Sequence, residues 1–125
     1  MVMPTERIKA VYARLADCAP LWYRGYADGR VTVEVDGCEH ALDPRLDLRN
    51  HSPTGFAWGY NGSGPAQLAL AITADALGSD AVALAVYQAY KARVVAGLPG
   101  DRPWGPISDV AVRATVAQLL ADGAA

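Results

Sequence analysis

The hydrophobic and polar positions of this chain change period along its length, and the changes predict its elements. Apolar residues recur at helical spacing in residues 5–17, which predicts an amphipathic helix at the N-terminus. Further on, Val31, Val33 and Val35 alternate with polar residues. That alternation is typical of a strand with one buried face.

Two turn signals flank this strand and predict a meander. Asp28-Gly29 and Asp36-Gly37 are dipeptides that favour two-residue hairpin turns, because both central positions need a positive φ. They predict three antiparallel strands over residues 21–27, 30–35 and 38–42. A sheet of three strands with one apolar face needs helices to cover that face.

The second half of the chain has a helical pattern. Residues 65–77 are apolar almost all round, which predicts a central, buried helix. Ser79 and Ser108 can cap two further helices, over residues 80–96 and 108–121. Residues 100–106 are expected to form a polar turn. The prediction is a single α+β domain: a three-stranded antiparallel meander packed against a helical hairpin, with an extra N-terminal helix and a C-terminal helix.

The composition of the chain argues for some classes of protein and some kinds of partner and against others. The chain has 125 residues, of which 52% are hydrophobic, and a net charge of −2, which argues against nucleic acid as the main partner. No apolar run reaches the ~18 residues of a membrane span. With two cysteines and no secretory leader pattern, we expect a cytoplasmic protein. A chain this small and apolar is also expected to form a homo-oligomer. No metal-ligand spacing is present, and no cofactor is predicted.

The candidate chemistry lies in residues 50–72, a glycine-rich and aromatic loop that leads into the apolar helix. Ser63 can cap this helix, and Pro65 suits its first turn. Glycines ahead of a helix allow backbone amides to converge, and the helix dipole adds partial positive charge. The pattern predicts a site for phosphate or carboxylate.

Several side chains could complete this site. Arg49 and His51 could neutralise the anion, and the loop aromatics could stack on a base. Arg24 lies on a strand face between Trp22 and Tyr26, where it could also bind an anion. The residues predicted to bind a small anionic or nucleotide-like ligand are Arg24, Arg49, Asn50, His51, Phe56, Trp58, Tyr60, Asn61, Gly62, Ser63 and Gly64.

Other interpretations of the loop stay open. The glycines could serve only tight turns and close packing, and the aromatics could fill a core. The spacing Gly59-x4-Gly64 matches the glycines of a phosphate-binding P-loop, but Pro65 replaces the lysine. A protein-interaction module would use Trp58, Tyr60 and Trp104 as hot spots. A small hydrolase would use His51 as its general base.

Five segments resemble a small family of unknown function found in bacteria, phages and plasmids. They are YRGY (23–26), LDPRLDLRNHSPTGF (42–56), WGY (58–60), GSGPAQLALAI (62–72) and VVAGLP (94–99), and the resemblance covers about residues 21–104. The family carries no assigned reaction. Its phage and plasmid context implies a role in defence or anti-defence. The order of elements is also similar to phage sponges that sequester cyclic ADP-ribose-type signals, which implies non-catalytic ligand capture.

Overall fold

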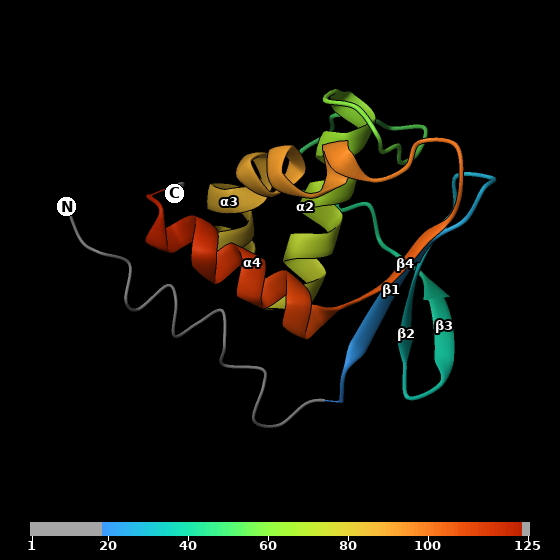
Figure 1. The fold of residues 1–125 in the computed structure, drawn as a ribbon, viewed down its shortest axis with the longest axis horizontal. Coiled ribbons are helices and arrows are strands. Elements are labelled where there is room, and N and C mark those ends of the chain that lie inside the picture. Colours follow the sequence, from blue (N-terminus) through green and yellow to red (C-terminus); the bar gives the residue numbers. More distant parts are fainter. Residues whose placement is uncertain (1–18, 124–125) are drawn as a thin grey trace.

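The structure, a computed structural model, describes residues 19–123, which form an α+β fold (Figure 1). The predicted helix at residues 5–17 lies outside the described residues. The elements in chain order are β1 (Leu21–Gly25), β2 (Val31–Val35), β3 (Cys38–Ala41), α2 (Ser63–Leu77), α3 (Asp80–Arg93), the 3-10 helix η2 (Val95–Gly97), β4 (Trp104–Ser108) and α4 (Asp109–Ala121).

The sheet has four antiparallel strands in the order β3-β2-β1-β4, so the prediction of three strands was wrong by one. Residues 104–108, assigned in part to a polar turn, pair with β1 instead. The glycine and proline of Trp104-Gly105-Pro106 give this segment the composition of a turn. A proline is nevertheless tolerated here, because β4 is an edge strand whose outer side pairs with no other strand of residues 19–123.

The meander itself is confirmed, with shorter strands. Asp36 and Gly37 have φ values of 51° and 81°, and they form the two-residue turn between Val35 and Cys38. The connection from β1 to β2 is longer than the predicted two residues. It is closed by a hydrogen bond of 2.8 Å from the Tyr26 amide to the Arg30 carbonyl.

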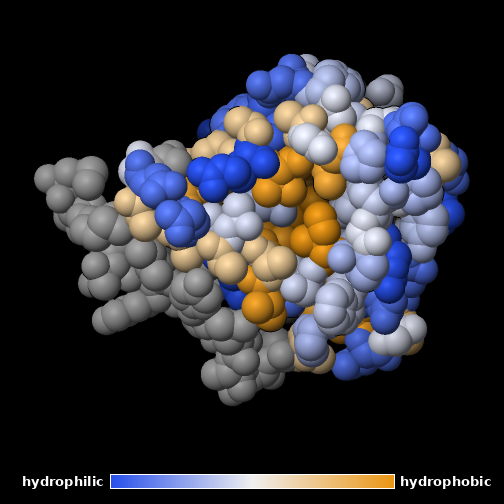
Figure 2. Space-filling model, in the orientation of Figure 1, coloured by the Kyte–Doolittle hydropathy of each residue, from blue (hydrophilic) through white to orange (hydrophobic). Residues whose placement is uncertain are grey.

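One face of the sheet packs toward the helices. Tyr23 pairs with Val33 in the β1–β2 register, and both side chains are buried. Trp22, Arg24 and Glu34 lie on the opposite, outer face. Figure 1 shows α2 between this sheet and α3, while α4 starts at the end of β4 and packs along α2. In the same view, apolar residues gather in the middle of the molecular face and hydrophilic residues border them (Figure 2).

The central position of α2 is as predicted, since every residue from Gly64 to Ala74 is buried. Its start differs. Gly62, rather than Ser63, occupies the N-cap position, and its carbonyl accepts the Ala66 amide at 2.9 Å. Pro65 is therefore the third helical residue. Ser79 and Ser108 cap α3 and α4 through their side chains, as predicted. The α3 helix ends at Arg93, before the predicted residue 96.

A buried ion pair ties α4 to the rest of the core. Arg113 Nη1 lies 2.8 Å from Asp109 Oδ2, and both side chains are only 2% exposed. Asp109 also accepts the Leu21 amide at 3.0 Å, and Arg113 donates to the Ala76 carbonyl at 3.0 Å. One charged pair thus joins α4 to the start of β1 and to the last turn of α2.

Candidate functional site

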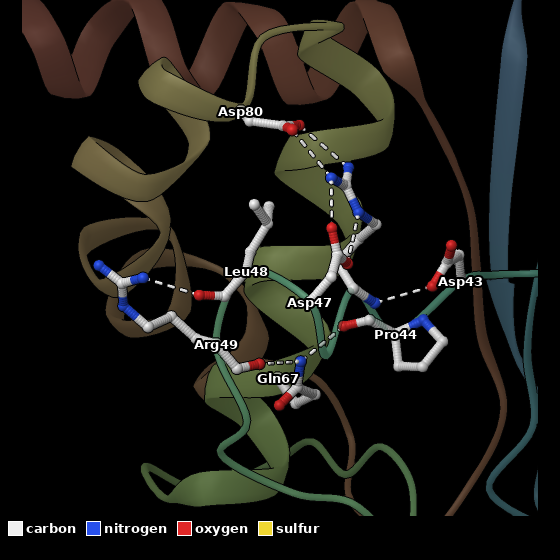
Figure 3. Close-up of polar contacts among 8 residues, drawn as sticks. Asp43, Pro44, Asp47, Leu48, Arg49, Gln67 and Asp80 are labelled. Atoms are coloured by element: carbon white, nitrogen blue, oxygen red, sulfur yellow. Dashed lines mark hydrogen bonds and ion pairs between the residues drawn. The ribbon is translucent and has the colours of Figure 1, made fainter.

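Residues 43–52, which we call the strap, are held on the surface of α2 by one buried side chain. Gln67 Oε1 accepts the amides of His51 at 2.7 Å and Ser52 at 3.1 Å. Gln67 Nε2 donates to the carbonyls of Pro44 at 2.5 Å and Arg49 at 3.1 Å, the two bonds drawn from it in Figure 3. Every hydrogen-bonding position of the amide is used. The glutamine of the GPAQ segment therefore acts as a structural anchor.

Arg45 fixes the strap to α3. Its backbone is in the left-handed region, with φ at 56°, and its amide donates to Asp43 Oδ1 at 2.9 Å. Its guanidinium binds the carboxylates of both Asp47 and Asp80 (Figure 3). These contacts hold the pKa of Asp80 below its ordinary value. A charge-assisted pair with two parallel bonds has a defined geometry, so this pair fixes where the strap meets the start of α3.

This docking decides where three of the predicted ligand-binding residues lie. Arg49 is exposed, and its Nη1 donates to the carbonyl of Leu48 at 2.7 Å. His51 Nε2 lies 2.7 Å from the Tyr87 hydroxyl of α3. Asn50 is exposed. Within residues 19–123, none of these three residues shares a hydrogen bond with residues 59–64.

The glycines ahead of α2 serve close packing. The Gly59 amide donates to the Val95 carbonyl at 3.1 Å. A Cβ on Gly64 would lie 2.6 Å from the Ala57 Cβ, and a Cβ on Gly62 would lie 2.6 Å from Tyr60 Cε2. The Tyr60 ring therefore covers one side of the helix start. Asn61 and Ser63 remain exposed there.

The loop aromatics converge elsewhere, on a groove beside the tip of the β1–β2 hairpin. One hollow of about 400 Å³ is lined by residues 29–32, 39–42, 55 and 56. A second, of about 370 Å³, is lined by residues 27, 29, 56–60 and 100. Because Gly29 and Phe56 line both hollows, we treat the two as one site, the Phe56 groove. Phe56, Trp58 and Tyr60, all predicted to bind ligand, therefore lie in one place.

Two buried tryptophans pack together at this groove: Trp58 lines it, and Trp104 contacts Trp58. Trp58 and Trp104 are 7% and 6% exposed, and their rings meet edge to face at 5.8 Å. Trp104 lies so close to β1 that a Cβ on Gly25 would be 2.1 Å from its Nε1. Of the three aromatics named as interaction hot spots, only Tyr60 is exposed, at 54%.

The polar side of the groove contains residues that the sequence pattern did not single out. Glu39 accepts hydrogen bonds from the hydroxyls of Thr32 and Tyr26, and these two bonds lower the pKa of its carboxyl. The Arg30 guanidinium lies 4.5 Å from the centre of the Tyr26 ring and pairs with Asp28 at 2.9 Å. Strand alternation places Thr32 on the sheet face opposite Val31 and Val33. The cross-strand register that brings Glu39 beside Thr32 is seen only in the structure.

Arg24, the remaining predicted residue, does not line either hollow of the groove. It pairs with Glu34 on the outer face of the sheet, with Nη1 at 2.6 Å from Oε1. Among residues 19–123, no three histidine, cysteine or acidic side chains are grouped as a metal site would require. Nor does any helix in that range combine the length and apolar character of a membrane span.

Comparison with known proteins gives one match. No curated protein and no solved structure matches the chain significantly. One family of unknown function, DUF6166, matches residues 23–118. The match includes the strap, the Phe56 groove and α2, and it extends past residue 104 into α4. Because it spans well over half of the chain, this protein belongs to the DUF6166 family.

Proposed function

We propose that the protein is a non-catalytic binding module that captures a nucleotide-like, anionic small molecule in the Phe56 groove. The observation that carries this proposal is the pair of hollows meeting at Phe56, about 400 and 370 Å³ in volume. Hollows of this size suit a small organic ligand. Gly55, Phe56 and the WGY segment, which line them, belong to the residues that define the family resemblance.

The two ends of the groove suit different parts of such a ligand. A planar base would stack on Phe56 or on the exposed ring of Tyr60. Beyond Tyr60 lies the start of α2, where the helix dipole favours an anionic group. Ser63 is exposed at this helix start. The phosphate would therefore lie at the Tyr60 end, with the rest of the ligand extending toward Arg30 and Glu39.

Capture without turnover would make the protein a sponge, as the phage and plasmid resemblance implies. A sponge lowers the free concentration of its ligand and releases the same molecule when it unfolds. We therefore expect a bound nucleotide to be recovered unchanged from the denatured protein, as measured by mass spectrometry. A hydrolysed nucleotide in the released fraction would instead favour an enzyme.

Calorimetric titration with nucleoside monophosphates, cyclic dinucleotides and ADP-ribose variants tests the binding directly. Tyr60→Ala is expected to weaken the tightest of these about fivefold or more, since a stacked aromatic is worth about 1–3 kcal/mol per base. Trp22→Ala is the matched control. It removes another partly exposed aromatic, 37% exposed on the outer sheet face, and should leave the affinity unchanged. Absence of binding by every probe would contradict the proposal.

A protein-interaction module is the second candidate, and the edge strand β3 favours it. All four residues of β3 are exposed, and the strand pairs only with β2 within the described residues. An unpaired strand edge can accept a strand from another chain. A homo-oligomer joined at this edge would show slow exchange of the β3 amides. A monomeric molar mass at every protein concentration, measured by light scattering, would exclude self-association.

A further inference from the structure

Only one oxygen of the Glu39 carboxylate accepts hydrogen bonds from the residues that the structure describes. Its Oε2 accepts both the Thr32 hydroxyl and the Tyr26 hydroxyl. No group within residues 19–123 donates to Oε1. Glu39 also lines the larger hollow of the Phe56 groove. Glu39 therefore lines the groove, and one of its two carboxylate oxygens has no hydrogen-bond donor among the described residues.

The position of the Glu39 carboxylate is fixed by one neighbour in β2 and one that follows β1. Thr32 belongs to β2 and is buried, while Tyr26 directly follows β1. The Tyr26 ring is held in turn by the guanidinium of Arg30, which Asp28 anchors through its side chain. A side chain oriented by such supporting contacts loses little freedom when it binds a ligand. Glu39 is therefore oriented before any ligand arrives.

The chemistry of an ionised carboxylate restricts what it can bind. It accepts hydrogen bonds and cannot donate them, so a phosphate beside Glu39 would be repelled while a hydroxyl would be attracted. We propose that Glu39 accepts hydrogen bonds from the sugar hydroxyls of the ligand, so that the Phe56 groove selects ribonucleotides over their dideoxy counterparts. This inference rests on the proposed function and assigns the orientation of the ligand: sugar toward Glu39, phosphate toward the start of α2.

Titrations with AMP, GMP, CMP and UMP, each beside its 2′,3′-dideoxy form, test the selection. We expect the wild-type protein to bind the best ribonucleotide at least tenfold more tightly than its dideoxy form. A site built to bond a hydroxyl discriminates strongly against a ligand that lacks it. Glu39→Ala should reduce this ratio to near one while the affinity for the dideoxy form stays the same. Glu39→Gln, which keeps the shape but removes the charge, should give an intermediate ratio.

Glu34→Gln is the matched control. Glu34 pairs with Glu39 in the cross-strand register, but its carboxylate binds Arg24 and does not line the groove. This variant should keep the wild-type ratio. Equal binding of ribo and dideoxy forms by the wild-type protein would overturn the role of Glu39 and leave the proposed function intact. An unchanged ratio of ribo to dideoxy affinity in Glu39→Ala would likewise overturn only the role of Glu39. Failure of every nucleotide to bind would overturn both.

Discussion

The guanidinium of Arg45 holds both carboxylate oxygens of Asp80, with Nη1–Oδ1 at 3.0 Å and Nη2–Oδ2 at 2.8 Å. This contact joins the strap to the first residue of α3. We expect Arg45→Gln to lower the urea midpoint of unfolding modestly, because exposed ion pairs stabilise proteins little unless their geometry is well defined. Arg102→Gln is the control, since the one ion-pair partner of Arg102 within the described part of the chain is its neighbour Asp101. Equal midpoints for the two variants would contradict a stabilising role for Arg45.

The same ion pair predicts a dependence of stability on pH. Arg45 lowers the pKa of Asp80 and of Asp47 below the ordinary aspartate value of 3.8. A carboxyl whose pKa is lowered by folding stabilises the native state above its unfolded pKa. That contribution is lost as the pH falls through the folded value. The difference in urea midpoint between wild type and Arg45→Gln should therefore be full at pH 7 and shrink below pH 3.8. A constant difference across this range would show that Arg45 acts by packing alone.

Loss of the Gln67 amide should release the strap. Gln67→Leu fills a similar volume but removes the partners of two carbonyls and two amides. A buried polar group left unpaired costs about 1–3 kcal/mol, so we expect the free energy of unfolding to fall by at least about 2 kcal/mol. Hydrogen exchange at the His51 and Ser52 amides should accelerate. Gln118→Leu, at an exposed glutamine of α4, serves as the control and should change neither measurement.

The buried pair of Arg113 and Asp109 predicts a non-additive pair of substitutions. Arg113→Met leaves the Asp109 carboxylate buried without its cation, which costs about 3–5 kcal/mol in comparable cases. Adding Asp109→Asn removes that charge and keeps an oxygen for the Leu21 amide. The double variant should therefore be more stable than Arg113→Met alone in urea unfolding. A double variant that is less stable than the single one would contradict this account.

Gly25 should resist substitution because of Trp104. Its added Cβ would lie 2.1 Å from the indole Nε1, so Gly25→Ala must displace the ring or the strand. Overpacking of this kind costs about 1–3 kcal/mol. The tryptophan fluorescence should shift, because Trp104 packs against Trp58. Gly97→Ala is the control, since no atom lies within 4 Å of its added Cβ. An unchanged spectrum for Gly25→Ala would contradict the close approach.

Much of the fold could be predicted because local signals agreed with the tertiary structure. The Asp36-Gly37 turn, the alternating valines of β2 and the serine caps of α3 and α4 are all decided by nearby residues. The strand β4 was missed because its pairing with β1 joins residues far apart in sequence. Within this short segment, glycine and proline favour a turn, and the single buried tryptophan is too weak a signal to predict a strand.

The candidate site was predicted only in part for a related reason. The aromatics of residues 56–60 lie together in sequence as well as in the groove. Glu39 and Tyr26 meet only through the register of three strands. Arg49 and His51 are close in sequence to the glycine segment. In the structure, Gln67 of α2 binds the backbone amide of His51, and Tyr87 of α3 binds its side chain.

The burial of α2 on all sides has a consequence for synthesis of the protein. The helix is synthesised before α3, β4 and α4. Its apolar surface therefore stays uncovered until those elements follow, and exposed surface of that kind promotes aggregation. Chaperones that hold apolar segments should bind released chains truncated between Leu77 and Ala121 more strongly than the full-length protein.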